Sequence, residues 1–206
     1  MPHPARRRPG GNVSKDALVR KWNDRYKDGD PDQARPADVL ADYMFLLPDS
    51  GRALEVACGL GGNAILMASH GLDTQAWEIA DQAVDAINRF APNHYLPLQA
   101  YCRDAVLEPP EPASFDVITC TRFLDRSLCP HLARALRPGG LLFYQTFTRL
   151  RVHGGGPSNP DFLLRDGELL DLFRALQPVV YTELRDLGDI TQGFRDQAML
   201  IARQRR

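Results

Sequence analysis

Residues 52–70, Arg-Ala-Leu-Glu-Val-Ala-Cys-Gly-Leu-Gly-Gly-Asn-Ala-Ile-Leu-Met-Ala-Ser-His, decide the fold of this chain. A short apolar run breaks into glycines, and apolar residues then resume at helical spacing, which predicts a strand, a tight turn and a helix. Gly59 and Gly61 permit positive φ and let a ligand approach bare backbone, while the first N–H groups of the helix and its positive dipole end face that ligand. We therefore expect a nucleotide-like cofactor at this turn.

Glu55 indicates which kind of cofactor would bind. It lies four residues before Gly59, in a strand expected to be buried on both faces, where an unpaired carboxylate is costly. The pattern Gly59-x-Gly61-x-x-Ala64 also fits a relaxed dinucleotide fingerprint, but a pyrophosphate would be repelled by this carboxylate. A cationic ligand removes the conflict, and the sulfonium and ammonium groups of S-adenosylmethionine supply two positive centres.

Residues 54–63 resemble the first motif of class I S-adenosylmethionine-dependent methyltransferases, in which an acidic residue precedes small residues and glycines. Ala57 stands where the family usually has its first glycine, and we expect a slightly tighter turn there. The turn at 136–142, Leu-Arg-Pro-Gly-Gly-Leu-Leu, is similar to one found widely in the family. The resemblance covers roughly residues 16–203 and implies an α/β, Rossmann-like fold with S-adenosyl-L-methionine as cofactor.

Composition bounds the remaining possibilities. The chain has 206 residues, enough for one domain, and its net charge of -1 offers no basic excess for nucleic acid. Neither a secretory signal nor a membrane-length apolar run is visible, so we expect a soluble, cytoplasmic protein, most simply a monomer, although edge strands could pair into a homodimer. No metal site is expected, because metal-ligand spacing is lacking among the four cysteines, Cys58, Cys102, Cys120 and Cys129.

The chain divides into a tail and one domain. Residues 1–13 are rich in Pro, Arg and Gly and are expected to be a disordered tail, and residues 14–206 form the methyltransferase domain, with 14–50 as an N-terminal helical cap. Helices are predicted over 15–26 (with Ser14 as N-cap), 37–47, 63–69, 81–89, 128–136 and 166–176. Strands are predicted after Gly51 and over 74–78, 94–100, 114–120, 141–147, 179–184 and 197–202. The family resemblance arranges them as a seven-stranded, mostly parallel sheet with an antiparallel C-terminal hairpin and helices on both faces.

Two acidic residues extend the predicted cofactor site. Glu78 lies 19 positions after Gly59, near the spacing at which a carboxylate at a strand end accepts hydrogen bonds from ribose hydroxyls. Asp104 follows the third strand, where the resemblance implies contact with the adenine amino group; an ordinary turn residue is the alternative. The predicted cofactor site comprises Glu55, Ala57, Cys58, Gly59, Gly61, Asn63, Glu78, Ile79, Asp104, Ala105 and Cys120.

The acceptor is expected to lie beside this site. The segment Trp22-x-x-Arg25-Tyr26 is similar to one that closes over cofactor or substrate in the tellurite-resistance-like branch of small-molecule methyltransferases; aromatic packing against the sheet is the alternative. Arg122 and Phe123 leave the fourth strand at the ligand-binding edge, where Arg122 would meet substrate or form a plain ion pair. The glycine-rich loop 148–163 leaves the fifth strand as a lid or as slack chain.

The chemistry of methyl transfer asks little of side chains, because in-line substitution at a sulfonium mainly requires alignment. A thiol or other chalcogen acceptor is favoured because it needs no general base. An amine or hydroxyl acceptor would require a general base, for which Asp125, Tyr144 and His153 are candidates. Arg122 is a further catalytic candidate. Two alternatives stay open: a non-catalytic S-adenosylmethionine-binding module, and an NAD(P)-dependent oxidoreductase, which Glu55 and the missing Tyr-x-x-x-Lys pair oppose.

Overall fold

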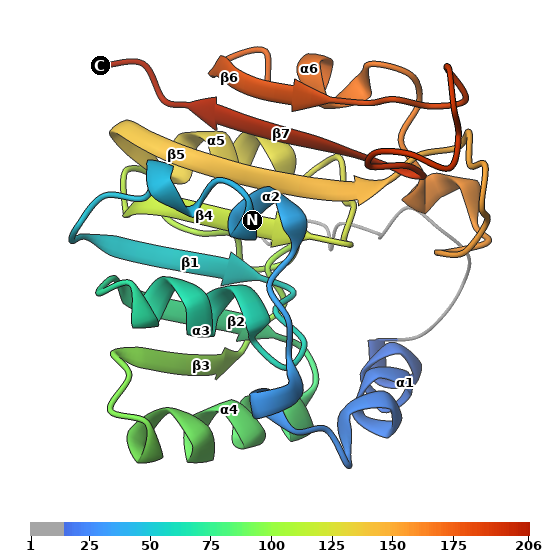
Figure 1. Cartoon of the computed structure of the whole chain (residues 1–206). Helices are drawn as coiled ribbons and strands as arrows, with labels where there is room; N and C mark the ends of the chain where they lie inside the picture. The colour runs from blue at the N-terminus through green and yellow to red at the C-terminus, as the bar shows by residue number, and fades with distance from the viewer. Residues whose placement is uncertain (1–14) are drawn as a thin grey trace, which may run out of the picture.

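A computed structural model describes residues 15–206, so the predicted tail and the N-cap Ser14 lie outside the described residues. The chain forms a seven-stranded sheet in the order β3-β2-β1-β4-β5-β7-β6 (Figure 1). Strands β1 to β5 pair in parallel, and β7 runs antiparallel to both β5 and β6, which confirms the predicted sheet and its hairpin. The strands are β1 Arg52–Val56, β2 Asp73–Glu78, β3 Leu98–Cys102, β4 Phe115–Thr121, β5 Leu136–Phe147, β6 Gln177–Thr182 and β7 Gln197–Arg203.

Helices cover both faces of the sheet, with α2, α3 and α4 on one side and α5 and α6 on the other, while α1 stands apart beside the ends of the strands (Figure 1). The α-helices are α1 Lys15–Tyr26, α2 Asp38–Ala41, α3 Gly62–Ser69, α4 Asp81–Asn93, α5 Cys129–Ala135 and α6 Glu168–Leu172. Single 3-10 turns are η1 Pro31–Gln33, η2 Met44–Leu46 and η3 Pro160–Phe162.

The sheet separates two apolar layers, as the alternation of side chains along a strand requires. On the α2–α3 face, Leu40 and Met67 pack against Phe143 of β5. On the α5–α6 face, Leu132 and Phe173 pack in a cluster with Tyr144, the next residue of β5. Because both faces of the central strands are covered, their side chains are almost completely buried, and polar groups in these strands need partners within the protein.

Two predicted helices are much shorter than expected. The helix predicted over 37–47 is wrong: α2 covers only four residues, the backbone leaves helical geometry at Tyr43, and a separate 3-10 turn follows. Pro48 disfavours helical geometry at the residue before it, so the chain reaches the first strand extended. The helix predicted over 166–176 is also too long, because Gly167 starts α6 in the left-handed region and Phe173 leaves helical geometry.

Two strand boundaries also differ from the prediction. The strand expected from residue 94 begins at Leu98, because α4 continues to Asn93 and Tyr95 then takes a φ of 54°. Residues 136–140, expected as a turn, belong to β5, which shifts register against β4 between Phe115 and Val117. The proline and glycines of this segment therefore lie in an irregular stretch of strand and not in a free turn.

Candidate cofactor and acceptor site

The glycine turn between β1 and α3 is held in left-handed backbone geometry. The φ angles are 53° at Ala57, 54° at Gly59 and 80° at Gly61. Such geometry is easy for glycine but costs an L-residue about 1–2 kcal/mol, so Ala57 is strained and not merely in a tighter turn as expected. The Cys58 N–H donates to the Trp77 carbonyl at 3.1 Å, which fastens the turn to β2.

Glu55 is buried beneath this turn, with only 2% of its surface exposed. Its Oε1 accepts a hydrogen bond from Asn63 Nδ2 at 2.6 Å, and its Oε2 accepts one from the Ala64 N–H at 2.7 Å. Burial raises the pKa of this carboxyl to about 8, although both hydrogen bonds lower it. The chain itself therefore supplies hydrogen-bond partners for the carboxylate. A cationic ligand is not its only partner, contrary to the expectation from the sequence.

Asn63 connects four segments through one side chain. Besides Glu55, its Nδ2 reaches Thr121 Oγ1 at 3.1 Å, and its Oδ1 accepts the Ala37 N–H at 2.8 Å. The end of β1, the start of α3, the end of β4 and the chain before α2 thus meet at a buried amide. Its predicted contact with the cofactor stays a prediction, while its structural function is visible.

Glu78 joins the end of β2 to the glycine turn. Its Oε2 accepts the Gly59 N–H at 2.9 Å, and its Oε1 accepts the Ile79 N–H at 2.8 Å and the Ala80 N–H at 3.3 Å. Burial raises the pKa of the carboxyl despite these three bonds. A carboxylate oxygen has two lone pairs, so Oε2 retains one for a ligand hydroxyl beside Gly59. The spacing that suggested ribose binding does bring the two residues together.

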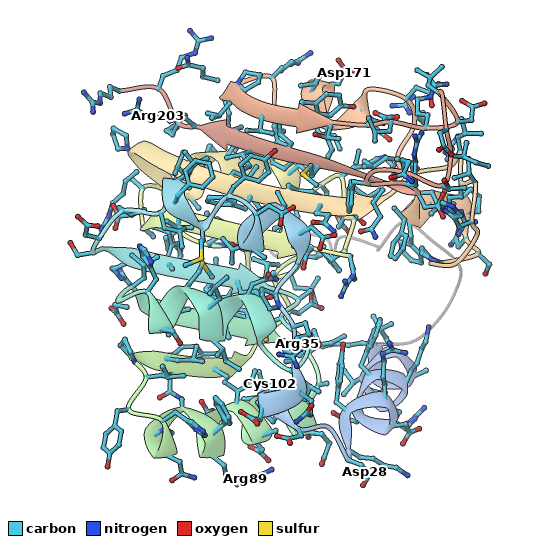
Figure 2. The ribbon with its side chains drawn as sticks, viewed as in Figure 1. Asp28, Arg35, Arg89, Cys102, Asp171 and Arg203 are labelled. Carbon is cyan, nitrogen blue, oxygen red and sulfur yellow. The ribbon has the colours of Figure 1, made fainter. Side chains whose placement is uncertain are left out.

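Residues 15–37, which we call the covering segment, pass directly over the glycine turn. A Cβ at Gly59 would lie 2.9 Å from Tyr26 Oη, one at Gly29 would lie 2.6 Å from a Leu60 methyl, and one at Gly62 would lie 2.5 Å from the Arg35 carbonyl oxygen. Arg35 is labelled in Figure 2 on the stretch that leads away from η1. Gly29 and Gly62 are therefore needed for close packing between the covering segment and the turn.

The aromatic residues of α1 belong to this cover. Trp22 and Tyr26 stack with their ring centroids 5.8 Å apart, and burial, followed by the nearby Glu78, raises the pKa of the Tyr26 hydroxyl to about 12. Arg25 lies over the Trp22 ring at 5.9 Å. Because Tyr26 packs on the glycine turn, the placement favours the covering interpretation over packing against the sheet.

Four other predicted cofactor residues are buried near the same edge. Asp104 accepts the Val106 N–H at 3.2 Å, as a turn residue does. Cys120 and Ala105 belong to the apolar cluster on the α5–α6 face, and the Cys58 thiol donates weakly to the Gly59 carbonyl. Contacts between these four residues and a cofactor stay predictions.

The catalytic candidates are dispersed. The Tyr144 hydroxyl donates to the Phe123 carbonyl at 2.8 Å and is 1% exposed, and burial raises its pKa well above the ordinary value. His153 is exposed, with Nδ1 3.7 Å from an Asp196 carboxylate oxygen. Arg122 is exposed directly after β4, with a strained φ of 53°. The structure therefore does not gather these side chains into one catalytic cluster.

Asp125 has structural partners at the start of α5. Its Oδ1 accepts hydrogen bonds from the Ser127 N–H at 2.9 Å, from the Ser127 hydroxyl at 2.5 Å and from the Leu128 N–H at 3.2 Å. The carboxylate also lines a groove at the ends of β4 and β5. Asp125 is thus the general-base candidate that remains beside a cavity.

Sequence reasoning missed most of that groove, which we call the arginine groove. It encloses about 480 Å³ and is lined by Leu124, Asp125, Arg126, Arg149, Asp161, Phe162 and Arg165. Beneath it, buried Glu168 accepts from Arg126 Nε at 2.8 Å and from an Arg165 terminal nitrogen at 3.0 Å. Burial raises the pKa of Glu168, but the arginine hydrogen bonds outweigh it, and the pKa falls to about 2. The available signal was an arginine shortly after each of two neighbouring strands.

Within residues 15–206, no three His, Cys, Asp or Glu side chains gather closely enough to hold a metal ion. In the same range, no helix combines the length and apolar character that a membrane crossing requires.

Known proteins resemble part of the chain in sequence. Residues 53–140 match the model described as a methyltransferase domain. This stretch, which includes the glycine turn and Glu78, is therefore similar to known methyltransferase domains. The ubiquinone biosynthesis O-methyltransferase of Idiomarina loihiensis is 30% identical over 104 residues, which are 48% of this chain and 43% of that protein. The protein of the same name from Paracidovorax citrulli is 32% identical over 112 residues, or 50% of this chain and 47% of that protein. The matched stretch thus spans about half the length of these curated relatives.

Solved methyltransferase structures share the fold over most of the chain. TehB from Haemophilus influenzae superposes with a TM-score of 0.67 at 18% identity, covering 93% of this chain and 67% of that one. A geranyl diphosphate C-methyltransferase from Streptomyces coelicolor, solved with S-adenosyl-L-homocysteine, gives 0.66 at 16% identity, covering 92% and 98%. These likenesses establish the methyltransferase fold.

Proposed function

We propose that the protein transfers a methyl group from S-adenosyl-L-methionine to a small-molecule acceptor. The observation that carries the proposal is the bond between the Glu78 carboxylate and the Gly59 N–H, which joins an acid at a strand end to a left-handed glycine turn. The family match over residues 53–140 contains both groups.

The residues at this edge fit the cofactor. Glu78 would hold the ribose hydroxyls through the free lone pair of Oε2, and the backbone of residues 59–61 would face the amino-acid portion. Glu55 lies buried beneath the turn, and a cationic ligand above it would favour the charged form of its carboxyl group. Asp104 is the proposed contact for adenine. When bound, S-adenosylmethionine supplies a methyl group on a good leaving group.

The protein contributes alignment and exclusion of water. The covering segment closes over the turn, so the acceptor approaches from the side of β4 and β5. The site would hold the acceptor heteroatom in line with the methyl group that bound S-adenosylmethionine would supply, and the acceptor proton would pass to solvent or to a base. In this arrangement Arg122 and Phe123 are proposed contacts of the acceptor.

The acceptor type divides into two candidates. A thiol or other chalcogen is supported by the buried, hydrogen-bonded state of Tyr144, which leaves it unable to act as a base at neutral pH. A hydroxyl acceptor is supported by the names of the curated relatives and by Asp125 in the groove, which would accept the proton. Turnover of thiophenol and of catechol, followed by mass spectrometry, distinguishes them.

Titration calorimetry tests the proposed cofactor. S-adenosylhomocysteine is expected to bind and NAD is not. Glu78→Gln should weaken S-adenosylhomocysteine binding about 10- to 100-fold, as for a lost charge-assisted hydrogen bond. Glu111→Gln, which changes an exposed carboxylate in the loop before β4, is the matched control and should bind normally. Binding of NAD alone would overturn the proposal, and binding of S-adenosylhomocysteine without turnover of any acceptor would support a non-catalytic module.

A further inference from the structure

The arginine groove lies at the edge of the sheet where a ligand of the glycine turn would lie. The strands β1, β4 and β5 point to the same side, and the loop after β5 meets that side (Figure 1). Thr121, the last residue of β4, is linked to Glu55 through Asn63, and the groove begins three residues later at Leu124. A molecule in the groove is therefore placed on the acceptor side of the proposed cofactor.

Two of the three groove arginines already have partners. Arg126 donates to both carboxylate oxygens of Glu168, to the Asp161 carbonyl at 2.6 Å and to the Leu163 carbonyl at 3.1 Å. Arg165 donates to Glu168 as well. These contacts fix the groove wall, and the two guanidinium groups are partly neutralised by a carboxylate whose pKa is about 2.

Arg149 differs from the other two. It is exposed and lines the groove, and within residues 15–206 its guanidinium has no hydrogen bond or ion pair. Its backbone is fixed, because the Arg149 N–H donates to the Leu164 carbonyl at 2.9 Å. The lining arginines are balanced by Asp125, Asp161 and Glu168, so attraction for an anion depends on this one guanidinium and not on excess charge.

The groove is formed in advance of any ligand. Thr148 and Leu164 make a parallel bridge, and the Leu164 N–H donates to the Phe147 carbonyl at 2.9 Å, so both ends of loop 148–163 are tied to β5. Phe162 presents an aromatic ring that is 42% exposed. A fixed apolar surface beside an available guanidinium suits a molecule with an apolar body and an acidic group.

We propose that the methyl acceptor carries a carboxylate or phosphate group, which Arg149 binds while the apolar body of the acceptor lies against Phe162. This proposal rests on the proposed methyltransferase function, because it assigns the groove to the acceptor. The guanidinium presents paired N–H donors that match a carboxylate or phosphate, whereas a neutral acceptor offers it no charged partner.

Ligand-observed NMR with defined probes tests the proposal, with and without saturating S-adenosylhomocysteine. The probes are 3,4-dihydroxybenzoate, phenyl phosphate and neutral catechol. We expect at least one acidic probe to bind about tenfold more tightly than catechol. Arg149→Gln should remove this advantage and leave catechol unchanged. Arg174→Gln, which removes the same charge from an exposed position outside the groove, should change neither.

The outcomes separate this proposal from the methyltransferase function. Equal affinity of acidic and neutral probes, no effect of Arg149→Gln, or no binding of the acidic probes at millimolar concentration would each overturn it. Calorimetry of the Arg149→Gln variant with S-adenosylhomocysteine should match the wild type, which also shows that the variant is folded. If S-adenosylhomocysteine binds normally while the acidic probes do not, the groove assignment is wrong and the methyltransferase proposal stands.

Discussion

Asn63 Nδ2 lies 2.6 Å from Glu55 Oε1, and this contact joins the buried acid of β1 to the first turn of α3. The same side chain binds Thr121 at the end of β4 and the backbone of Ala37 in the covering segment. Four segments of the chain therefore share one amide group, and the position of the acid depends on all of them.

Replacing this amide should destabilise the fold. Asn63→Leu leaves the buried Ala37 N–H without an acceptor and removes one donor from Glu55, so we expect a loss of about 2–4 kcal/mol in the free energy of unfolding, measured with urea. Asn93→Leu, at an exposed position at the end of α4, is the control and should cost about 0.5 kcal/mol or less. A loss for Asn63→Leu as small as that of the control would contradict the linking function.

Ala57 offers a stabilising substitution. Since its φ is 53°, Ala57→Gly relieves strain that exceeds the added freedom of glycine in the unfolded chain, and we expect a gain of about 0.5–1 kcal/mol. Ala68→Gly, inside α3, should instead lose about 1 kcal/mol. Chemical denaturation measures both variants. Similar losses for the two would show that Ala57 is not strained.

Glu168 predicts a loss of stability in acid. Its folded pKa of about 2 lies below the ordinary value of 4.5, so the unfolded state binds the proton first as the pH falls. The contribution of the arginine pairs, about 2–3 kcal/mol at neutral pH, should be complete above about pH 4.5 and disappear towards about pH 2. Glu168→Gln should flatten this part of the acid-unfolding curve, whereas Glu111→Gln should leave it unchanged. An unaltered curve for Glu168→Gln would refute the assignment.

Glu55 should give the free energy of unfolding the opposite dependence on pH. Its pKa is raised from 4.5 to about 8, so between these values the folded state holds a proton that the unfolded state has released. Stability should fall as the pH rises through this window, by at most about 1.4 kcal/mol per pH unit, and level off above it. The slope, measured by urea unfolding between about pH 5 and about pH 8, should be reduced in Glu55→Gln. Equal slopes in the two proteins would exclude a titrating Glu55.

The strand directions were predictable because the family resemblance implies a mostly parallel sheet with an antiparallel C-terminal hairpin, and the residues that meet at its edge follow from local signals. Glycines after a short apolar run, and a glutamate 19 residues further on, determine which backbone groups meet at the sheet edge. Hydrophobic periodicity also located α1, α3 and α5 within two residues of their observed ends. These features depend on neighbours in sequence, which is the information that patterns carry.

Features formed by distant contacts were not predictable. The short α2 is held by Gln145, whose Oε1 accepts the Val39 N–H at 2.8 Å across 106 residues of chain. The partners of Asn63 and Glu168 likewise come from other elements. From the sequence, Asn63 was predicted as a cofactor contact, and Glu168 only as a residue of the helix over 166–176. Tertiary partners decided these positions, and residue type alone could not indicate them.

The contact between Tyr26 and Gly59 has a consequence for the timing of the reaction. A ligand cannot reach the face of that glycine until α1 swings away, whereas the groove beyond β5 is tied in place and stays accessible. Under the proposed function, we expect the cofactor to bind and leave more slowly than the acceptor. We expect movement of α1 to limit release of the spent cofactor, so that turnover responds to solvent viscosity more than to the reactivity of the acceptor.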